Sequence, residues 1–477
     1  MTGPGRRRLR VAMYVANDAS RDSRVLREAD TLAAAGHDVI LVARASVENP
    51  LPAEEQAPSG VRLVRISRDR RAIARWRSVQ QRTGYPWRAR GVLARGWLRD
   101  LRAGPSGWFR AGARLLATVV VLPWIAYRLV GYVLLGDRPP GLRRHGQLDY
   151  VMTWRRSVLS WADAAANVAP DADVHHGHDV EGLAAAVAAA NRTGGLVVYD
   201  SHELYPESAR HARQGPLARF WLRSLERRLA RHAVALVTVN KSLEEILRKN
   251  LEFTRSVVVH NAPPRWTPPA KAPDLLRERL GLPPGALIAL YHGGFSAHRG
   301  LEELAEAMLE PGLEAVHAVF LGYGKQRAML DEMAVDPRFD GRLHVLDAVP
   351  PSELLPWVAP ADVAVMCIQP STLNHVLSTP NKLFEALAAG VPVVVSDFQE
   401  MREIVLGNPG GPLGAVCQPT DVADVANAIR QIVELPATEI TALRGRCLRA
   451  AHEQWNWETE SARLVALYEE LAAGLSS

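Results

Sequence analysis

The sequence predicts an α/β protein of two domains, each built on a doubly wound parallel sheet. Apolar runs with the length of strands alternate with helical patterns along most of the 477-residue chain, and that alternation is typical of parallel sheets covered by helices. A proline-rich stretch, Pro263 to Pro273, divides the alternation into two series. A chain of 477 residues is long enough for two or three domains of ordinary size.

The first series opens with a strand, a helix and a second strand. Val11–Ala16 is an apolar run that predicts a buried strand, and Asp22–Ala35 has helical spacing that stops at Gly36. Val39–Ala43 predicts the next strand, and the pattern resumes near Tyr150 after a long interruption. The other strands of this series are expected at Val174–His176, Leu196–Tyr199, Ala235–Val239 and Ser256–Val259.

The second series predicts another sheet after the proline-rich stretch. We therefore expect an N-terminal domain over residues 1–262, a linker over 263–273, a C-terminal domain over 274–450 and an amphipathic C-terminal helix within 451–477. The strands of the second sheet are expected at Leu287–Tyr291, Val316–Leu321, Leu343–Val345, Asp362–Met366 and Val391–Val395.

The interruption, residues 67–146, is an arginine-rich and tryptophan-rich insertion in the first domain. Between Arg62 and Arg144 there are 19 arginines and three aspartates, a formal charge of +16, so the rest of the chain carries −10. Its longest apolar run, Leu115–Tyr127, is shorter than the roughly 20 residues that cross a bilayer. The pattern favours a segment, centred on 111–136, that lies on an anionic membrane surface. The alternative is a helical insertion packed on the first domain.

Charge and cysteine content exclude other classes of protein. Arginine with aromatic residues also occurs in nucleic-acid-binding proteins, but no recognition motif is present, so no nucleic-acid partner is expected. The three cysteines match neither a zinc pattern nor a disulfide framework. Arg10 interrupts the first apolar run, which predicts a strand and not a secretory signal. We expect a cytoplasmic protein, peripheral at the inner face of the plasma membrane if the insertion binds lipid.

Polar residues follow the predicted strands of the first domain, where open α/β sheets bind ligands. His178 follows the strand Val174–His176 and is one of three histidines within four positions, which favours a functional role over a structural one; Asp179 is placed to orient it. The residues after the next strand are Asp200, His202 and Glu203. The first turn between strand and helix holds Arg21, Asp22 and Arg24, for which contact with phosphate or acceptor and a plain helix cap with exposed arginines remain open.

In the second domain, Ser378–Ser396 predicts a helix start that suits a diphosphate. Ser378 or Thr379 is a good N-cap, Pro380 a good first helical residue, and Gly390 ends the helix. Asn381 and Lys382 follow in the first turn, and an ammonium at a helix N-terminus favours phosphate binding. Glu385 lies on the same face as Lys382 and can accept hydrogen bonds from a ribose diol. The alternative is a solvated Lys–Glu pair on a surface helix.

A glycine pair follows the first strand of the second series. Gly293 and Gly294 allow a close approach of the backbone to phosphate, and Arg299 adds a positive charge before the helix that begins near Leu301. Taken alone, a glycine pair is more often an ordinary turn.

Six segments of the chain, in order, resemble the retaining glycosyltransferases of family 4, which have the GT-B fold. The resemblance covers nearly all of the chain except the insertion, and it implies two Rossmann-like domains that face a cleft, with the C-terminal helix crossing back to the first domain. The segments are Asp22–Val25 with Gly36–Val39, Asp173–Asp179, Tyr199–Glu207, His292–Gly294 with Arg299–Gly300, Leu321–Gly324, and Ser378–Glu385.

The resemblance also implies roles for single residues. Arg299 and Lys382 would share the diphosphate of a nucleotide-sugar donor and act in catalysis, Glu385 would bind the ribose, and His178 would lie beside the transferred sugar. Further donor contacts would come from Gly293, Gly294 and Asn381. The acceptor side of the cleft would hold Arg21, Asp22, Arg24, Asp179, Asp200, His202 and Glu203.

Two positions depart from the family pattern. The family typically has a glutamate eight residues before the ribose-binding one, and this chain has Leu377 there. The first of two basic residues after the glycine is replaced by Gly294, while the second is kept as Arg299. These departures leave the identity of the donor sugar open.

The sequence thus predicts a hexosyltransferase-type enzyme that retains anomeric configuration and needs neither a metal nor another cofactor. Asp171-Ala172-Asp173 precedes a strand and indicates a turn, not a metal site. The acceptor is a lipid-linked or membrane-proximal glycan if the insertion binds a membrane, or otherwise a soluble small molecule. Two alternatives are a non-catalytic, membrane-associated relative that has lost activity and a GT-B-type nucleotide-sugar epimerase.

Overall fold

A computed structural model describes residues 7–20, 22–46, 50–67, 147–208, 211, 214–269 and 273–475, and residues 104, 108 and 112 singly. Arg21 and most of the insertion, including the segment 111–136 for which membrane contact was predicted, lie outside the described residues. Among the helices that the structure describes, none combines the length and the apolar character needed to cross a bilayer.

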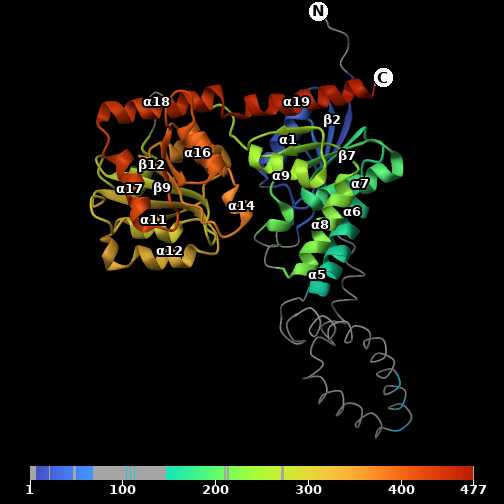
Figure 1. The fold of residues 1–477 in the computed structure, drawn as a ribbon, viewed down its shortest axis with the longest axis horizontal. Helices are drawn as coiled ribbons and strands as arrows, with labels where there is room; N and C mark the ends of the chain where they lie inside the picture. The colour runs from blue at the N-terminus through green and yellow to red at the C-terminus, as the bar shows by residue number, and fades with distance from the viewer. Residues whose placement is uncertain are drawn as a thin grey trace, which may run out of the picture. The chain divides into compact units, whose positions relative to one another are not determined.

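The chain divides into two compact units (Figure 1). The first contains Arg7–Ser201 and Ala209–Leu236, and the second contains His202–Ser208 and Val237–Ser477. The predicted fold class, two α/β units on parallel sheets, is confirmed.

The first sheet has eight strands in the order β3-β4-β2-β1-β5-β6-β7-β8. Its central pairs are parallel, and the short β3 runs antiparallel to β4. β1 and β5 lie next to each other although β2 and β4 come between them in sequence, so the strand order reverses there. The strands are β1 (Arg10–Val15), β2 (Asp38–Arg44), β3 (Glu54–Gln56), β4 (Arg62–Ile66), β5 (Val174–His178), β6 (Leu196–Ser201), β7 (Ala233–Thr238) and β8 (Ser256–Val258).

Helices follow the strands of this sheet. Asp22 caps the first of them by accepting a hydrogen bond from the backbone of Val25, one of the two roles that the sequence left open, and Gly36 lies just beyond its end with φ of +94°. The helices are α1 (Ser23–Ala34), α5 (Gln147–Trp154), a π-helical turn (Arg155–Leu159), α6 (Ser160–Ala165), α7 (Asp179–Thr193), a 3-10 turn (Tyr205–Glu207), α8 (Pro216–Ala230) and α9 (Lys241–Leu251).

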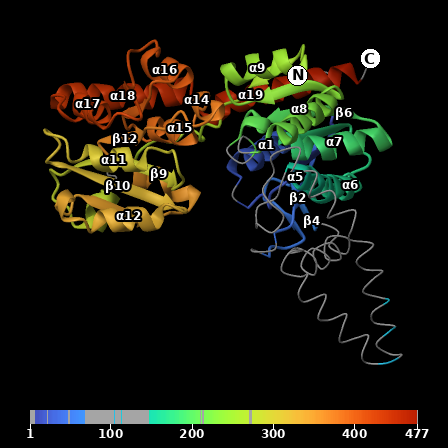
Figure 2. The same ribbon diagram turned by 60° about the horizontal axis from the view of Figure 1, so that its bottom comes forward.

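The second sheet has six parallel strands in the order β11-β10-β9-β12-β13-β14. The order reverses between β9 and β12, in the same way as at β1 and β5. In Figure 2, α12 lies below these strands and α17 and α18 lie above them. The strands are β9 (Leu287–Gly294), β10 (Val316–Tyr323), β11 (Leu343–Asp347), β12 (Val363–Met366), β13 (Val393–Ser396) and β14 (Gly414–Cys417).

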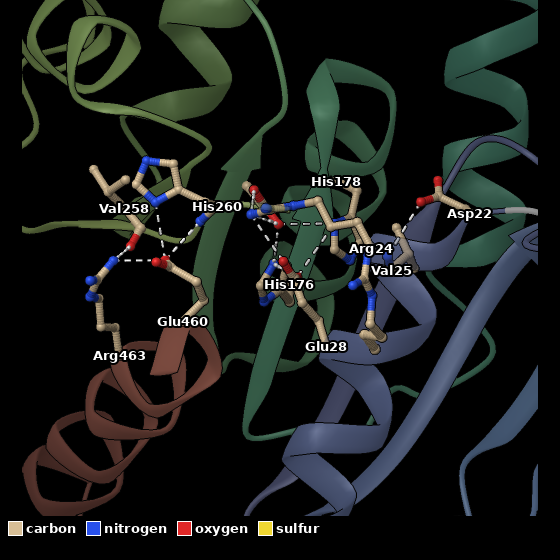
Figure 3. Close-up of polar contacts among 12 residues, drawn as sticks. Asp22, Arg24, Val25, Glu28, His176, His178, Val258, His260, Glu460 and Arg463 are labelled. Atoms are coloured by element: carbon tan, nitrogen blue, oxygen red, sulfur yellow. Dashed lines mark hydrogen bonds and ion pairs between the residues drawn. The ribbon is translucent and has the colours of Figure 1, made fainter. Parts of the chain in front are cut away.

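The helices of the second unit end in a long pair, α18 and α19, separated by a turn at Asn456, which caps α19. On α19, Glu460 accepts hydrogen bonds from the backbone and the ring of His260, at 2.9 and 3.2 Å (Figure 3). The helices are α10 (Leu275–Leu280), α11 (Leu301–Ala307), α12 (Arg327–Ala334), a 3-10 turn (Pro337–Phe339), a 3-10 turn (Pro351–Glu353), α13 (Leu354–Val358), α14 (Leu373–Val376), α15 (Asn381–Ala388), α16 (Gln399–Leu406), α17 (Val422–Val433), α18 (Ala437–Glu453) and α19 (Trp457–Gly474).

All predicted strands are present, and the majority of their ends lie within one or two residues of the predicted ends. Three further strands were missed. β3, β4 and β14 escaped prediction because they are short, and β3 and β4 carry charged residues that hide the apolar pattern. The central strands of both sheets are almost wholly buried. In open α/β sheets, ligands bind outside the carboxyl ends of the strands where the strand order reverses. The fold therefore indicates two places to search, one in each unit.

Candidate functional site

Five charged or titratable side chains gather where the strand order of the first sheet reverses (Figure 3). They come from three elements that the chain brings together at the carboxyl ends of β1, β5 and β6, and each is at most 3% exposed. We call this set the histidine cluster; its members are Arg24 and Glu28 of α1, His176 and His178 of β5, and Asp200 of β6.

Arg24 connects the two carboxylates of the histidine cluster. Its Nη2 forms an ion pair with Glu28 Oε1 at 3.0 Å and donates hydrogen bonds to both oxygens of Asp200, at 3.1 and 3.3 Å. Burial lowers the pKa of Arg24, but Asp200 and Glu28 more than offset that effect, and the net shift is upward. The guanidinium therefore stays charged and fixes the orientation of both acids.

The two imidazoles stack on each other with their centroids 4.6 Å apart. His178 Nδ1 lies 3.2 Å from Asp200 Oδ2 and 4.0 Å from Glu28 Oε2. His176 Nε2 lies 3.6 Å from Asp200 and 3.8 Å from Glu28. Asp200 is thus positioned to orient His178, which is the role that the sequence suggested for Asp179.

Two glycines allow the histidine cluster to form. A Cβ on Gly177 would lie 2.5 Å from backbone atoms of Leu183, and one on Gly182 would lie 2.2 Å from the carbonyl oxygen of Tyr14. Neither distance is tolerated, so only glycine lets α7 approach β1 and β5 this closely. The close packing places His178 at the last position of β5.

His175 has a different, structural role. Its Nδ1 pairs with the Tyr14 hydroxyl at 3.1 Å and its Nε2 with the carbonyl of Gly194 at 3.2 Å. Burial lowers the pKa of His175, against a smaller upward effect of the Gly194 carbonyl. This histidine is a neutral ring that ties β5 to its neighbours.

The remaining predicted residues of the acceptor side have varied surroundings. Asp22 is a helix cap, and Arg24 is 3% exposed, so the alternative of an exposed arginine is wrong for Arg24. Asp179 begins α7 with φ of +54°, and His202 is half-buried. Glu203, in the second unit, accepts a hydrogen bond from Asn374 at 3.1 Å. Arg21 lies outside the described residues.

A second site lies where the strand order of the second sheet reverses, at the end of β9. Lys382, in the first turn of α15, places its Nζ 3.6 Å from the centroid of the Tyr291 ring. A Cβ on Gly293, which has φ of +111°, would lie 3.6 Å from the same ammonium. The predicted glycine pair and the predicted lysine are therefore neighbours.

Positive charge is under-compensated at this second site. Burial, and then the proximity of Arg299, lower the pKa of Lys382 well below its usual value, while Glu385 acts in the opposite direction. Of the part of the chain that the structure describes, no carboxylate forms an ion pair with Lys382 or Arg299. Two cations held close together without an acid bridging them are suited to a multiply charged anion.

Glu385 lies one turn further along α15 and faces β9. Its Oε2 is 3.1 Å from Nε2 of His292, which is 2% exposed. The pairing holds the carboxylate beside Gly293 while leaving Glu385 partly exposed, because 24% of its side chain remains accessible. An accessible carboxylate oxygen in this place can accept hydrogen bonds from a diol.

The loop after β9 is held by direct contact between backbones. A Cβ on Gly322 would lie 1.9 Å from the carbonyl oxygen of Gly293, and one on Gly324 would lie 2.2 Å from that of Phe295. Gly300, with φ of +73°, starts α11 over the carbonyl of Cys367, 2.2 Å from where its Cβ would be. A cavity of about 150 Å³ adjoins Arg299, lined also by Ser296, Glu303, Gln326 and Gln369.

One local prediction for this site is wrong. Helix α15 begins at Asn381, and Pro380 occupies the N-cap position without a side-chain cap, so neither Ser378 nor Thr379 caps the helix. The Ser378 hydroxyl donates instead to the carbonyl of His375 at 2.9 Å, which completes the preceding turn. Gly390 ends the helix with φ of +70°, as predicted.

The structure adds residues that sequence reasoning did not assign. Glu28 and His176 join the histidine cluster, and Tyr291 and His292 position Lys382 and Glu385. The signal for Glu28 was present, because an acid stood on the apolar face of its helix with Val25 and Ala29. His176 was visible only as a neighbour of His178.

Two family descriptions match the sequence. Residues 118–262 match the family described as Glycosyltransferase Family 4, and residues 286–434 match Glycosyl transferases group 1. The chain is a family 4-type glycosyltransferase of GT-B fold. As such it takes its sugar from a nucleotide-sugar donor.

Curated relatives of this glycosyltransferase differ in what their names say they make. The chain is 27% identical to a glycogen synthase of Mycobacterium tuberculosis over 306 residues, which is 62% of this chain and 68% of that one. It is 30% identical to a D-inositol 3-phosphate glycosyltransferase of Xylanimonas cellulosilytica over 224 residues, 44% of this chain and 51% of the relative.

Solved structures show the same fold at low identity. The glycosyltransferase matches a sucrose-phosphate synthase of Thermosynechococcus elongatus with a TM-score of 0.67, 16% identity and coverage of 98% of this chain and 100% of the other. It matches HepE of Anabaena in complex with UDP with a TM-score of 0.62, 13% identity and coverage of 97% and 100%.

Proposed function

We propose that this glycosyltransferase moves a hexose from a nucleoside-diphosphate sugar to an acceptor hydroxyl with retention of anomeric configuration. The observation that carries the proposal is the pair of cations, Lys382 and Arg299, near the start of α15, where no carboxylate of the described residues forms an ion pair with either. A diphosphate supplies the missing negative charge, and the amides at the start of α15 add donors to it.

The nucleoside end of the donor is bound by Glu385. Its carboxylate is fixed by His292 and remains partly exposed, so it is placed to accept hydrogen bonds from the two ribose hydroxyls. Gly293 leaves room for the diphosphate beside the Lys382 ammonium. HepE, a structural neighbour, has been solved with UDP and with UDP-glucose, which makes uridine nucleotides the first donors to test.

Chemistry at the sugar involves the first unit. The bond between the anomeric carbon and the diphosphate oxygen breaks, and the acceptor oxygen forms its bond on the same face of the sugar. The proton of the acceptor hydroxyl passes to the departing diphosphate. Lys382 and Arg299 stabilise the charge on that leaving group, so that no metal ion is required. His178 contacts the transferred sugar.

Membrane contact belongs to the same proposal. The arginine-rich insertion, residues 67–146, carries a formal charge of +14 from 17 arginines and three aspartates, and we expect it to bind anionic lipid and bring the enzyme to a lipid-linked or membrane-proximal acceptor. Sedimentation with phosphatidylglycerol vesicles, compared with phosphatidylcholine vesicles, tests this step by itself. Equal sedimentation with both would favour an insertion packed on the protein and a soluble acceptor.

The donor site is tested by a thermal-shift screen of the purified protein against UDP, GDP, ADP, TDP and their sugars. A nucleotide at one hundred times its dissociation constant stabilises the folded protein by about 2.7 kcal/mol. We expect one nucleotide to do so, and Lys382→Ala and Glu385→Ala to abolish the shift. Lys249→Ala, at an exposed lysine of α9, is the matched control.

Product analysis decides the stereochemistry. Once the donor is known, the anomeric coupling constant of the product in proton NMR shows whether configuration is retained. An inverted product contradicts the proposal. If no nucleotide or nucleotide sugar stabilises the protein, with or without vesicles, the proposed donor site is wrong and a non-catalytic role becomes the better hypothesis.

A further inference from the structure

We infer that Asp200 is the positioning residue of His178, and that Arg24 and Glu28 hold Asp200 in place. The inference rests on the proposed function, in which His178 contacts the sugar. It moves Arg24 and Asp200 from the acceptor side, where the family resemblance placed them, to an internal support for one histidine.

The first argument is the direction of the hydrogen bond. Asp200 Oδ2 lies 3.2 Å from Nδ1 of His178, and an ionised carboxylate can only accept, so Nδ1 carries the proton. A fixed proton on Nδ1 sets the tautomer of the ring and leaves Nε2 as its acceptor nitrogen. Burial of both side chains, at 0% and 1% exposure, keeps water from competing for this contact.

The second argument is the support of Asp200 itself. Both its oxygens accept hydrogen bonds from Nη2 of Arg24, at 3.1 and 3.3 Å, and the same nitrogen forms an ion pair with Glu28 at 3.0 Å. The carboxylate is thus fixed from one side by a guanidinium and from the other by an imidazole. A residue held in this way is built to orient a partner, because its own rotamer has no freedom.

A divalent metal ion is the competing occupant of the histidine cluster. One oxygen or nitrogen from each of Glu28, His176, His178 and Asp200 lies within 4.8 Å of the others, which is a ligand set that zinc accepts. Arg24 decides against it: its nitrogen lies within 3.3 Å of the Asp200 oxygen that faces His178. A divalent ion on that oxygen would stand close to a permanently charged guanidinium.

A hydrogen bond to Asp200 and a bound metal ion would give opposite tautomers of His178. This difference supplies a test that does not depend on enzyme turnover. Protein labelled with ¹⁵N-histidine reports the state of each imidazole nitrogen, and His178→Gln identifies the signals of His178. Protonated Nδ1 in the wild-type protein, lost in Asp200→Asn, is the expected result. Protonated Nε2 with one equivalent of zinc by elemental analysis means a metal site and overturns the inference, as does a tautomer unaffected by Asp200→Asn.

A double-mutant cycle then tests the role in catalysis. Turnover is measured as release of sugar from the nucleotide sugar found in the thermal-shift screen. Asp200→Asn is expected to lower kcat about 100-fold or more, as loss of acid–base positioning does, with little change in nucleotide affinity. In the His178→Gln background the same change should cost less than about threefold, because Asp200 acts through His178.

The double-mutant cycle has other outcomes, and each has a defined meaning. A second 100-fold loss in the His178→Gln background would mean that Asp200 contacts substrate directly. Asp173→Asn, at the opposite end of β5, is the matched control for an aspartate in the same unit. Because nucleotide binds in the other unit, unchanged affinity shows that the second unit is folded, and a wild-type-like thermal unfolding transition checks the first unit. Glu28→Gln, a gentler change in the same cluster, replaces Asp200→Asn if that variant does not fold. If the wild-type protein turns over no donor, the proposed function fails while the tautomer experiment still decides the inference.

Discussion

The two units place charged side chains at equivalent points of their sheets, but they treat the charges differently. In the first unit, Arg24 is ion-paired with Glu28 and Asp200, and all members of the histidine cluster are buried. In the second, Arg299 lowers the pKa of Lys382 and Glu385 opposes that effect, while no carboxylate in the described part of the chain forms an ion pair with either cation. The first arrangement pairs its charges within the protein, and the second is the one to which the proposed function assigns an anion.

This difference in charge pairing indicates two different roles, orientation of a catalytic group and binding of a ligand. A cluster that satisfies its own charges is rigid and suits the orientation of a catalytic group. A site with surplus positive charge is costly in the free protein and is relieved by its ligand, so binding energy is concentrated there. The comparison predicts that substitutions in the first unit reduce turnover, whereas those in the second unit reduce affinity.

The largest effect is expected at His178. His178→Gln should lower kcat by about 10²–10⁴-fold, the usual contribution of a positioned histidine, and leave nucleotide affinity unchanged. Steady-state kinetics with the identified donor and calorimetry with the nucleotide measure the two quantities separately. His175→Gln, at the structural histidine of the same strand, is the control. A loss of nucleotide affinity at His178 would erase the distinction between the units.

Glu226, a buried acid that pairs with a tyrosine, provides a contrast to the ion-paired acids of the histidine cluster within the first unit. Tyr199 donates to Glu226 at 2.8 Å, and burial raises the pKa of Glu226 to about 7 from 4.5. The folded state then binds more protons than the unfolded one between these values, so stability falls as pH rises from about 4.5 to about 7, by about 3 kcal/mol, and levels off above.

Glu226→Gln should remove that slope. Urea unfolding of the two proteins at pH 5 and at pH 8 measures the effect. The free energy of unfolding of the variant should exceed that of the wild type only at the higher pH. Exposed Glu54→Gln serves as the control. An unchanged slope would mean that the carboxylate of Glu226 is stabilised as an ion, in the manner of the histidine cluster.

Arg299 is expected to show the next largest effect, now on affinity. Removing one charge-assisted contact to a diphosphate costs about 1.5–3 kcal/mol, so Arg299→Ala should weaken nucleotide binding roughly 10- to 100-fold. Calorimetry should show a smaller loss for the nucleoside monophosphate, which carries less charge. Equal losses for the two nucleotides would place Arg299 away from the diphosphate.

The smallest effect tests the surplus charge itself. A lowered pKa at Lys382 means that the folded state holds its proton less well than the unfolded state, so this group costs stability below its unfolded pKa and the cost disappears as pH rises. Lys382→Met should therefore raise the melting temperature of the free protein at pH 7, by roughly 2–4 °C, although it abolishes nucleotide binding. Nucleotide affinity in the wild type should fall as pH rises through the lowered pKa. A less stable Lys382→Met would show that the ammonium is well compensated.

Much of the fold followed from local pattern. Strands such as Val316–Leu321 are continuous apolar runs, and fully buried parallel strands must be apolar on both faces, so the sequence alone located them. β4, with two arginines in five residues, was missed because an outer strand does not need that pattern. The start of α15 was misplaced because proline at the N-cap position overrode the usual preference for serine or threonine.

The candidate sites were predictable only in part. A motif at a strand end pointed to His178, because the carboxyl ends of parallel strands converge, and a helix-start pattern pointed to Lys382 and Glu385. Their partners were not predictable in the same way. Nothing in the spacing of Arg24 and Asp200, 176 residues apart, says that they meet, since contact between distant elements depends on strand order, which a single sequence does not specify.

The span of the histidine cluster along the chain has a consequence for synthesis. The residues of the second site, from Tyr291 to Glu385, emerge from the ribosome within about a hundred positions of each other. Arg24 and Glu28, in contrast, emerge long before Asp200 and are separated from it by the arginine-rich insertion. At roughly 5–20 residues per second, the two α1 charges stay without their β6 partner for about ten seconds or longer. A nascent chain that stops before β6 would therefore carry an open first unit, and pulsed proteolysis of stalled chains should find α1 protected only after residue 201 has left the tunnel.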